Sequence, residues 1–325
     1  MYKRSFGTKT PIEEIERVPP ASFLTIDINT METVTKKYWT PRFDPIDRPF
    51  KHVVEEFIQI FQKVMDERTD DDVQYGLMLS GGSDSRLLLE GLGPETTAFH
   101  LADWENREAQ IAKQLSTTVG AEFCLLERDK EYQYRALEEN PKLSNFSGWF
   151  DQAHASGFRN TIANESDVLF AGQFADTLFK GYAFPKRSIP LGKLGSLDLP
   201  IGKTITDKSD YIDHVASSEI PPYVDTDDTL LDIIERNLHK STSSVDYHGV
   251  QYRDLQTLPY LDEIFPISNQ TDFFWHESLF HMMPYRNPFL DNRLIQLYLT
   301  IPPNDQLRNN LINRAVEKTA PSLAA

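Results

Sequence analysis

Hydrophobic and polar residues group between about residues 50 and 172 into blocks that predict helices and strands in turn. Apolar residues at helical spacing predict helices, and short apolar runs bounded by turn residues predict strands. The expected elements are a helix at 50–67, a strand at 74–79, a helix at 84–91, a strand at 96–101, a helix at 105–118, a strand at 122–126, and a further strand, turn and helix that begin at 167–172. Strands that alternate with helices are joined by parallel crossovers, so we predict an α/β fold with an open, twisted, parallel sheet.

Two regions depart from this alternation. Residues 1–48 are rich in proline and contain the runs "FLTIDI" and "TVTKKYW", which predict two strands joined by a polar turn. Residues 185–250 carry many Pro, Gly, Ser and Asp residues, which predicts a surface insertion or a mobile region, and from about residue 225 onward the pattern is mostly helical. We therefore predict an N-terminal segment of strands and linker at 1–48 and one domain at 49–325.

Composition places the chain among folded proteins. It has 325 residues, of which 40% are hydrophobic and 11% aromatic, so it can bury a sizeable core. It has no apolar run of about 18 residues and no apolar segment near the N-terminus, so we expect neither a membrane span nor a signal peptide. Cys124 is the only cysteine. A single cysteine excludes an intramolecular disulfide and fits a reducing cytoplasm.

The net charge of −16 bears on the choice of partners. A surface this acidic repels nucleic acid and anionic lipid, so we expect neither as a partner. The excess of acidic residues is typical of proteins from salt-loving organisms, and it also serves ordinary solubility; composition does not separate the two. The histidines are scattered and do not have the spacing of a zinc site.

The stretch "YGLMLSGGSDSRLLLEGL", residues 75–92, places small polar residues between two elements that both require burial. At the end of a parallel strand, Gly81 and Gly82 allow the backbone N–H groups to approach an anion, and the following helix adds the positive end of its dipole. Asp84 would repel a bare phosphate, which indicates a bridging Mg²⁺. The alternative is a tight strand-to-helix turn with an N-capping side chain.

This stretch resembles the SGGxDS signature of the N-type ATP pyrophosphatases, and in particular of asparagine synthetases. Three other stretches support the same resemblance, in the family's order: "ERVPPASFLTIDINTMETVTKKYW" at the exit of the glutaminase domain, "AGQFADTLFKGY" for SGEGADELFGGY, and "YRNPFLDNRLIQLYLTIPP" for RxPFLDxRLxExxxxLP. The resemblance implies a sheet of the adenine nucleotide alpha hydrolase-like type and a reaction in which ATP is cleaved to AMP and pyrophosphate while a carboxylate is adenylated.

Site residues follow by position from the resemblance. The residues that match the pyrophosphate loop are Ser80, Gly81, Gly82, Asp84 and Ser85. Met78 falls where the family's strand contacts the adenine side of ATP, and His100 on the next strand lies beside the nucleotide unless it is only a half-buried strand histidine. Ala171 and Gly172 match a pair that also touches ATP. Asp176 matches the aspartate that holds Mg²⁺ on the pyrophosphate together with Asp84.

The sequence departs from the family pattern where catalysis is expected. Gln173 stands in place of a glutamate tied to the chemistry of the acyl-adenylate, and Asn309, with Arg308 beside it, falls where a catalytic lysine is expected. Losing both charges together is electrostatically consistent, because either one left alone in a dry site is costly. The other departures are Phe174 for a glycine, Thr177 for an acidic residue and Arg86 for a serine.

The ends of the sequence also bear on the resemblance. The sequence stops at "APSLAA", before a basic stretch that follows in the family, so fewer cations are expected to neutralise pyrophosphate. The candidates for that role are Arg308, Arg314, Lys180 and Lys186. Tyr2 follows Met1, where glutamine-dependent members carry a nucleophilic cysteine. We therefore expect ammonia from solution or from a separate glutaminase subunit.

Three functions are consistent with these residues. The first is an amide ligase that uses ATP and Mg²⁺ to adenylate a small carboxylic acid, aspartate or a related one, for attack by ammonia. The second is another ligase of the N-type ATP pyrophosphatase class, against which the stretches at 171–182 and 285–303 speak. The third is a nucleotide-binding scaffold or regulatory subunit that has lost its catalytic charges.

Overall fold

The computed structural model describes residues 7–10, 12–145, 153–181, 184, 186–190, 196–200, 205–219, 228–262, 264–269, 273–308 and 310–324. The chain divides into two compact units. The first consists of Met1–Asp44 and Ala183–Thr271, and the second of Pro45–Tyr182 and Asp272–Ala325. The predicted boundary near residue 48 lies close to the first change of unit. The segment expected as an insertion is grouped with the N-terminal residues.

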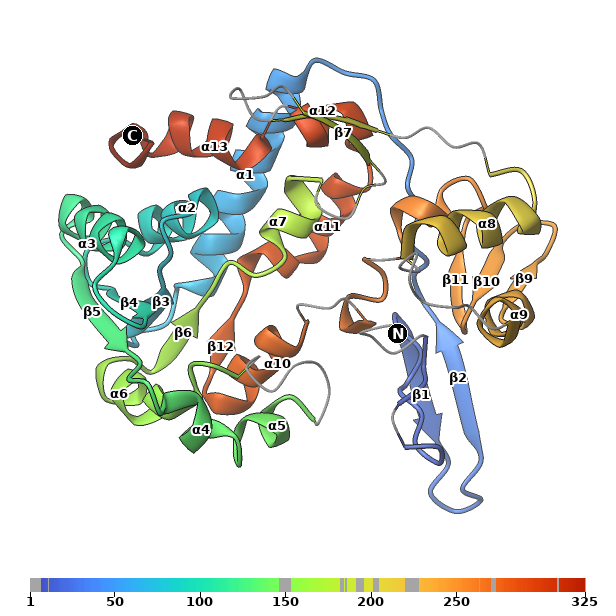
Figure 1. Ribbon diagram of the computed structural model, residues 1–325, viewed down its shortest axis with the longest axis horizontal. Helices are drawn as coiled ribbons and strands as arrows, with labels where there is room; N and C mark the ends of the chain where they lie inside the picture. Colours follow the sequence, from blue (N-terminus) through green and yellow to red (C-terminus); the bar gives the residue numbers. More distant parts are fainter. Residues whose placement is uncertain are drawn as a thin grey trace. The chain divides into compact units, whose positions relative to one another are not determined.

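The second unit is built on a five-stranded parallel sheet with the strand order β12–β6–β3–β4–β5 (Figure 1). Its strands are β3 (Tyr75–Met78), β4 (Thr97–Ala102), β5 (Glu122–Glu127), β6 (Val168–Phe170) and β12 (Tyr285–Arg286). The chain first runs outward from β3 to β5 and then returns to the other side of β3 with β6 and β12. The order of the strands therefore reverses between β3 and β6.

Helices cover both faces of this sheet. The helices described in this unit are α1 (Phe50–Arg68), α2 (Ser83–Leu92), α3 (Arg107–Val119), α4 (Tyr132–Ala136), α5 (Asn140–Leu143), α6 (Arg159–Glu165), α7 (Ala175–Phe179), α10 (Phe273–Met282), α11 (Asn292–Tyr298), α12 (Pro303–Arg308) and α13 (Leu311–Thr319). Helix α2 packs on β3, helix α3 packs on β4 and β5, and α1 and α13 lie against α2. Strands covered on both faces carry nearly continuous apolar runs, which explains the composition of the predicted strands.

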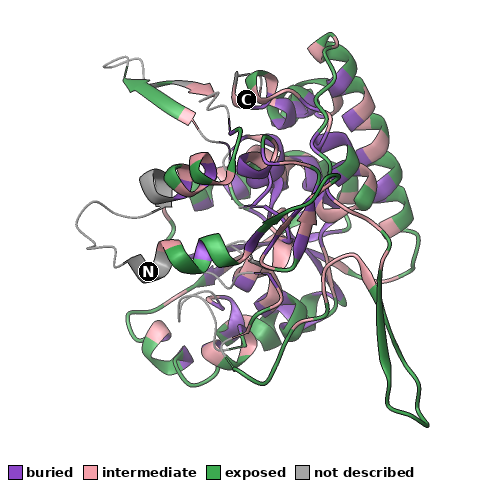
Figure 2. Cartoon of the chain, turned by 90° about the vertical axis from the view of Figure 1, so that its right-hand side faces the viewer, coloured by how far each residue is buried: buried purple, intermediate pink, exposed green. Residues whose placement is uncertain are grey.

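The core of the second unit follows from the helical and strand periodicities. In α1 the buried side chains recur at three- and four-residue spacing, as in Phe57, Phe61 and Val64. On one face of the sheet, strand residues such as Phe99 and Leu169 pack with residues of α6 and α10. The buried positions gather on the strands and on the helix faces turned toward them (Figure 2). The fold is therefore an α/β fold with an open parallel sheet, as predicted.

The described residues of the first unit form three small antiparallel sheets. Its elements are β1 (Ser22–Ile26), β2 (Thr33–Lys37), β7 (Lys186–Pro190), β8 (Ser196–Pro200), α8 (Lys208–Glu219), α9 (Asp228–Arg236), β9 (Leu238–Lys240), β10 (Val245–Tyr247) and β11 (Val250–Tyr252). Strands β1 and β2 form the predicted hairpin. The expectation of a mostly helical chain after residue 225 is wrong for 238–252, where short β-branched and aromatic runs pair as the sheet β11–β10–β9.

The other elements among the described residues are single turns of 3-10 helix. They lie at Ser156–Phe158, Leu258–Tyr260, Ile267–Asn269, Pro288–Leu290 and Pro321–Leu323. Within the described part of the chain, every helix is too short or too polar to cross a membrane.

Candidate functional site

Two loops meet where the strand order reverses, at the carboxyl ends of β3 and β6. The first loop runs from β3 into α2, and the second runs from β6 into α7. A Cβ atom added to Gly172 in the second loop would lie 3.3 Å from the Cβ of Asp84 in the first, so the loops are in close contact. Open parallel sheets bind ligands at such a reversal, because neighbouring loops turn to opposite faces and leave a crevice between them.

The first loop needs its glycines for space. Neither Gly81 nor Gly82 has a positive φ, so the backbone conformation is open to other residues. A Cβ on Gly81 would lie 3.3 Å from a methyl carbon of Ile111, and one on Gly82 would lie 3.2 Å from the hydroxyl of Ser80. Close packing against α3 and within the loop is therefore a further reason for glycine at these two positions.

Buried polar contacts fix the shape of this loop. The hydroxyl of Ser85 donates to the carbonyl oxygen of Ser80 at 2.9 Å and also lies 2.9 Å from that of Gly82. The Nδ1 of His100 lies 2.7 Å from the carbonyl oxygen of Leu79, which accepts its proton. Ser85 and His100 are both buried. Ser85 and His100 thus hold the backbone that leads from β3 into the loop. Contact of either side chain with a nucleotide stays a prediction.

The N-terminus of α2 is a ready anion site. Its N-cap residue, Gly82, provides no side-chain cap, so the first N–H groups of the helix remain for a ligand. Arg86, which replaces a serine of the family pattern, points elsewhere: its guanidinium donates to the carbonyl oxygens of Gly81 and Leu323 at 3.2 and 2.5 Å. Arg86 thus ties the loop to the end of the chain, a role that the sequence did not reveal.

Asp84 and Asp176 are brought together, with Lys180 between them. The Nζ of Lys180 lies 2.7 Å from Oδ2 of Asp84 and also forms an ion pair with Oδ1 of Asp176. The side chain of Asp84 is 14% exposed and that of Asp176 is 58% exposed. Burial raises the pKa of Asp84 to about 6; Lys180 opposes this rise and Asp176 adds to it. Burial alone would lower the pKa of Lys180, but the two carboxylates raise it above the ordinary value.

The two carboxylates fit a Mg²⁺ ion that arrives with phosphate. Oδ1 of Asp84 is buried and has no hydrogen-bond partner, so one hard oxygen donor remains for a cation. In the described part of the chain, no cluster of three or more His, Cys, Asp or Glu side chains could hold a metal. Magnesium commonly takes one or two carboxylates and completes its shell with phosphate oxygens and water, so this pair suits that arrangement.

Gln173 is held by two residues of the neighbouring segment. The hydroxyl of Tyr285 donates to Oε1 of Gln173 at 2.6 Å, and the side-chain amide of Asn287 donates to its backbone oxygen at 2.9 Å. Burial raises the pKa of Tyr285, so the phenol stays protonated and remains a donor. With Oε1 occupied, the NH₂ group of Gln173 is left to donate. The wall of the site at Gln173 is therefore neutral and offers hydrogen-bond donors.

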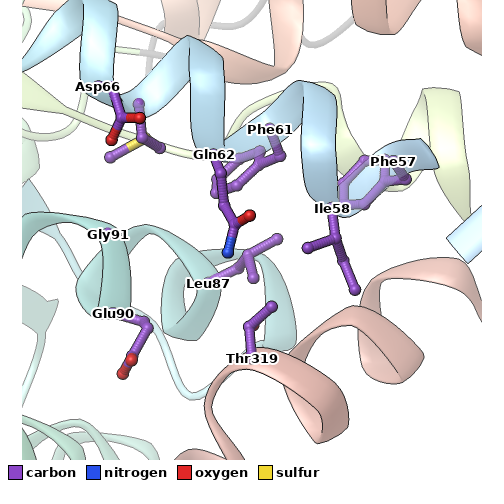
Figure 3. A pocket seen from close by; sticks show the side chains of 10 residues that line it. Phe57, Ile58, Phe61, Gln62, Asp66, Leu87, Glu90, Gly91 and Thr319 are labelled. Carbon is purple, nitrogen blue, oxygen red and sulfur yellow. The ribbon is translucent and has the colours of Figure 1, made fainter. Parts of the chain in front are cut away.

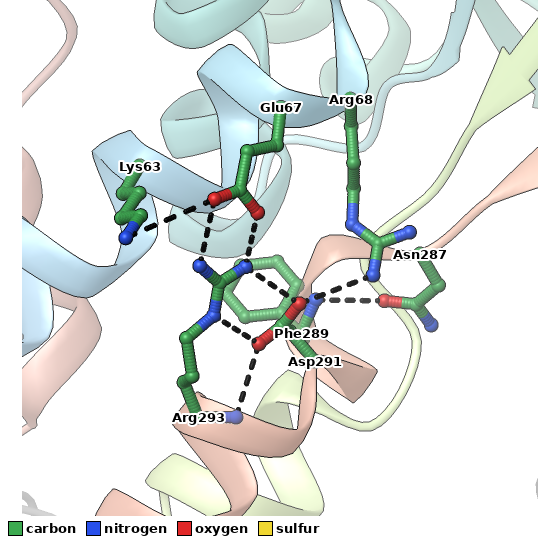
Figure 4. Close-up of polar contacts among 7 residues, drawn as sticks. All are labelled: Lys63, Glu67, Arg68, Asn287, Phe289, Asp291 and Arg293. Atoms are coloured by element: carbon green, nitrogen blue, oxygen red, sulfur yellow. Dashed lines mark hydrogen bonds and ion pairs between the residues drawn. The ribbon is translucent and has the colours of Figure 1, made fainter.

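The "RNPFLD" segment supports the second loop from behind. A Cβ on Gly172 would lie 3.4 Å from the ring of Phe289, which is fully buried. Asp291 caps α11 by accepting from the backbone N–H of Arg293 at 3.0 Å, and it pairs with Arg68 of α1 at 3.3 Å (Figure 4). The guanidinium of Arg293 also pairs with Glu67. These contacts make the segment a structural support rather than a ligand contact.

The loops and strand ends line a pocket of about 270 Å³. Of the predicted residues, it is lined by Met78, Ser80, Asp84, Ser85, His100, Ala171, Gly172, Gln173 and Asp176. Gly81 and Gly82 lie in the adjoining loop. Sequence reasoning missed Trp275 and Glu108, which also line the pocket. Trp275 comes from α10, far along the chain, and no motif marked it; Tyr285, which holds Gln173, stood inside a motif that had been noticed.

Other predicted residues are not brought to this pocket by the described structure. Asn309 lies outside the described residues, so its prediction stays untested. Arg308 is the last residue of α12, and the prediction for its side chain likewise stays untested. Arg314, a candidate for neutralising pyrophosphate, pairs with Glu317 at 2.9 Å. Lys180 reaches the site, and Lys186 belongs to β7 of the first unit.

A second hollow, of about 210 Å³, lies between α1, α2 and α13 (Figure 3). Its walls include the apolar side chains of Phe57, Phe61 and Leu87. Their polar neighbours there are Gln62, Asp66 and Glu90. It lies among helices and away from the strand ends, and it does not bring together the residues of either loop. The pocket at the two loops is the better candidate for chemistry.

Comparison with known proteins gives one strong similarity. The profile of the Asparagine synthase family matches residues 56–320. No curated protein matches the chain. Among solved structures, NMN synthetase from Francisella tularensis is 16% identical, with a TM-score of 0.28 and coverage of 73% of this chain and 96% of that chain. A predicted subunit of tRNA methyltransferase from Methanocaldococcus jannaschii is 13% identical, with a TM-score of 0.24 and coverage of 62% and 90%. Both structural similarities are distant, and the family match is the informative one.

Proposed function

The chain belongs to the asparagine synthase family, and from that premise we propose that it is an ATP-dependent amide ligase. It carries an ATP pyrophosphatase domain of the asparagine synthase type. In the proposed reaction, a carboxylate oxygen of the acid attacks the α-phosphorus of ATP and pyrophosphate leaves. Ammonia then attacks the acyl carbon, and AMP leaves with the pair of electrons of the broken carbon–oxygen bond. The products are an amide, AMP and pyrophosphate.

The observation that carries this proposal is the contact between the two loops. The N-terminus of α2 supplies N–H donors for an anion, and Asp84 of the same helix faces Asp176 across the site through Lys180. Donors fixed before the reaction stabilise the charge that develops on the leaving pyrophosphate. Magnesium, when held by Asp84 and Asp176, would neutralise phosphate charge. Leu79 and Ser80 are held by His100 and Ser85, so the donors keep their positions.

The acid is expected to bind beside Gln173. Its carboxylate must reach the α-phosphorus from the side of the pocket formed by the second loop. There Gln173 offers N–H donors and Trp275 offers an aromatic wall. A neutral amide favours a hydrogen-bond acceptor on the acid, whereas a glutamate would favour an ammonium group. Aspartate is therefore one candidate acid, and acids without an amino group at this position are the others.

Ammonia is the proposed nitrogen donor. Cys124, the only cysteine of the chain, lies in β5, and burial raises the pKa of its thiol. A thiol with a raised pKa is a poor nucleophile for glutamine hydrolysis. We propose that ammonia comes from solution or from a separate glutaminase subunit, and that the enzyme works in the cytoplasm, where a lone cysteine stays reduced.

Two features support a second candidate, a nucleotide-binding scaffold without turnover. Gln173 is neutral where the family pattern has a glutamate, and Lys180 occupies the space between the two aspartates. A scaffold would bind ATP and Mg²⁺ and release neither AMP nor pyrophosphate.

The experiment that separates these candidates measures AMP and pyrophosphate in mixtures of the chain, ATP, Mg²⁺, ammonium and a panel of carboxylic acids with and without amino groups. A ligase forms both products in equal amounts with one acid, and replacing ammonium by glutamine abolishes amide formation. Asp84→Asn should remove the activity, while Asp129→Asn, an exposed site paired with Arg135, should leave it intact. Tight binding of ATP without products from any acid would favour the scaffold.

A further inference from the structure

Lys180 holds an unusual place in a site for a metal and a polyphosphate. It follows α7 directly, one helical turn after Asp176, so its side chain lies on the same face as that carboxylate. Its Nζ lies 2.7 Å from Oδ2 of Asp84 and also pairs with Oδ1 of Asp176. One ammonium thus bridges two carboxylates, one from the first turn of α2 and one from the first turn of α7. The side chain is only 24% exposed, which makes the pair stronger than an ion pair on the open surface.

The charges of these three groups decide how a free metal ion meets the site. Two carboxylates and one ammonium leave a net charge of −1, and the ammonium already takes one oxygen of each carboxylate. A divalent ion that approaches alone must either displace the ammonium or sit beside a like charge. Among the described residues, no group of three or more His, Cys, Asp or Glu side chains could hold a metal, so the pair is not completed by a third such ligand. Free metal therefore gains little here.

A metal that arrives on ATP meets a different balance. The phosphates attract the ammonium, and the flexible four-carbon chain of a lysine lets it turn toward them. The N-terminus of α2 lies beside the same pair, and its uncapped N–H groups are donors that suit phosphate oxygens as well. Oδ1 of Asp84, which has no partner, then has a cation to ligate. Binding of the metal–ATP complex therefore supplies the metal ion and, at the same time, draws the ammonium of Lys180 away from the two carboxylates.

We propose that Lys180 makes the site select the metal–nucleotide complex over the free metal ion, because its ammonium occupies the Asp84–Asp176 pair while nucleotide is absent. Lys180 is then a specificity-determining residue of the nucleotide site. The inference deepens the proposed function and rests on it for the identity of the nucleotide. It does not depend on turnover, because the competition takes place before any reaction.

The test measures binding of Mn²⁺, a probe for Mg²⁺, to the nucleotide-free chain through the electron paramagnetic resonance signal of the free ion. Lys180→Met removes the charge and keeps the length of the side chain. It should tighten Mn²⁺ binding at least tenfold relative to the parent. Lys180→Arg keeps the charge and should bind Mn²⁺ as weakly as the parent. Adding Asp84→Asn to Lys180→Met should abolish the gain, which locates the bound ion at the pair.

The melting temperature of each variant, measured with and without Mn²⁺, separates loss of stability from loss of binding. If Lys180→Met lowers the melting temperature because Asp84 loses its partner, Mn²⁺ should restore it in that variant and not in the double variant. Unchanged or weaker Mn²⁺ binding by a folded Lys180→Met or Lys180→Gln chain would overturn the inference. The proposed function fails separately, if no acid yields AMP and pyrophosphate, and that failure leaves the Mn²⁺ measurement unaffected.

Discussion

Gln173 is a residue whose neighbours determine its chemistry. A free glutamine can present either its oxygen or its nitrogen to a ligand, but the hydroxyl of Tyr285 takes Oε1 at 2.6 Å. Asn287 anchors the backbone of the same residue. The orientation of the amide is therefore set by a strand and a turn that lie more than 100 positions further along the chain.

Tyr285→Phe tests that orientation. Without the hydroxyl, Oε1 of Gln173 loses its donor, so we expect a loss of about 1 kcal/mol in the free energy of unfolding. The freed amide should also raise the KM for the acid severalfold with little change in ATP affinity. Tyr75→Phe is the matched control. Tyr75 is the first residue of β3, and its hydroxyl donates to Asp71 just before that strand, at the end of the sheet opposite to the site. If both variants change the KM for the acid equally, Gln173 does not face the acid.

His276 gives a pH-dependent stability at the residue scale. It lies among the rings of Phe174, Phe273 and Tyr285, and burial lowers its pKa from 6.5 to about 4. Below pH 6.5 the unfolded chain takes up a proton that the folded chain refuses until about pH 4. The contribution of neutral His276 to the free energy of unfolding is therefore fully present above pH 6.5. It falls as the pH is lowered toward 4, and the total loss is at most about 3 kcal/mol.

Chemical denaturation of His276→Phe across this pH range measures that loss. The variant should lose less stability than the parent between pH 6.5 and 4, since a phenylalanine takes up no proton. His52→Gln, at an exposed position of α1, should follow the parent curve. Parallel curves for the parent and His276→Phe would mean that this histidine titrates alike in both states.

At the scale of elements, the site depends on how closely two strand-to-helix loops approach. Gly172 lies between Asp84 on one side and Phe289 on the other, at distances that leave no room for a methyl group without a shift. The segment that holds Phe289 is fixed in turn by Asp291, Arg68 and Arg293 (Figure 4). Helices α1 and α11 thus hold the segment of Phe289, this segment packs against the second loop, and the second loop packs against Asp84.

Gly172→Ala should separate the two loops by a few tenths of an ångström. We expect a severalfold loss of affinity for ATP with Mg²⁺ and a loss of about 1 kcal/mol in stability, because the methyl group overpacks the contact. Gly120→Ala is the control for stability. Gly120 follows the last turn of α3 with a φ of 85°, so alanine is strained there. The substitution lies at the end of α3 that is remote from the two loops. Calorimetric titration should show reduced ATP affinity for the first variant only.

At the scale of the whole molecule, the net charge of −16 opposes the compact state and the approach of polyanions. Within the site the negative charge of Asp84 and Asp176 is partly offset, since Lys180 and the N-terminus of α2 provide local positive charge. The surface and the site therefore respond differently to salt.

We expect the melting temperature to rise by several degrees as NaCl increases from about 0.1 to 1 M, where the screening length falls from about 10 to 3 Å. The control is the same titration near the isoelectric point of about 4.9, where the net charge vanishes and the effect should shrink. An equal rise at both pH values would show that salt acts through something other than self-repulsion.

The sequence by itself determined the α/β alternation and the two loops of the site. Periodicity is local, so helices such as 50–67 and strands such as 74–79 were predicted to within a few residues. The small residues of "SGGSDS" also indicated an anion site, because glycines directly before a helix let backbone N–H groups approach an anion. The short strands between 238 and 252 were missed, since three residues carry too little pattern to separate a strand from a helix.

The meeting of Asp84 with Asp176 was expected from the family resemblance, but only the tertiary structure decided which other side chains contact them and Gln173. The strand order brings Asp176 to Asp84, and the packing of β12 beside β6 brings Tyr285 to Gln173. Lys180 could be counted as a cation from the sequence, but its bridge between two carboxylates depends on the contact of the two loops. Periodicity predicts which face of a helix or strand is buried, but it does not predict which element covers that face. The covering element is decided by the order of the strands and by the fit of side chains that lie far apart in the sequence.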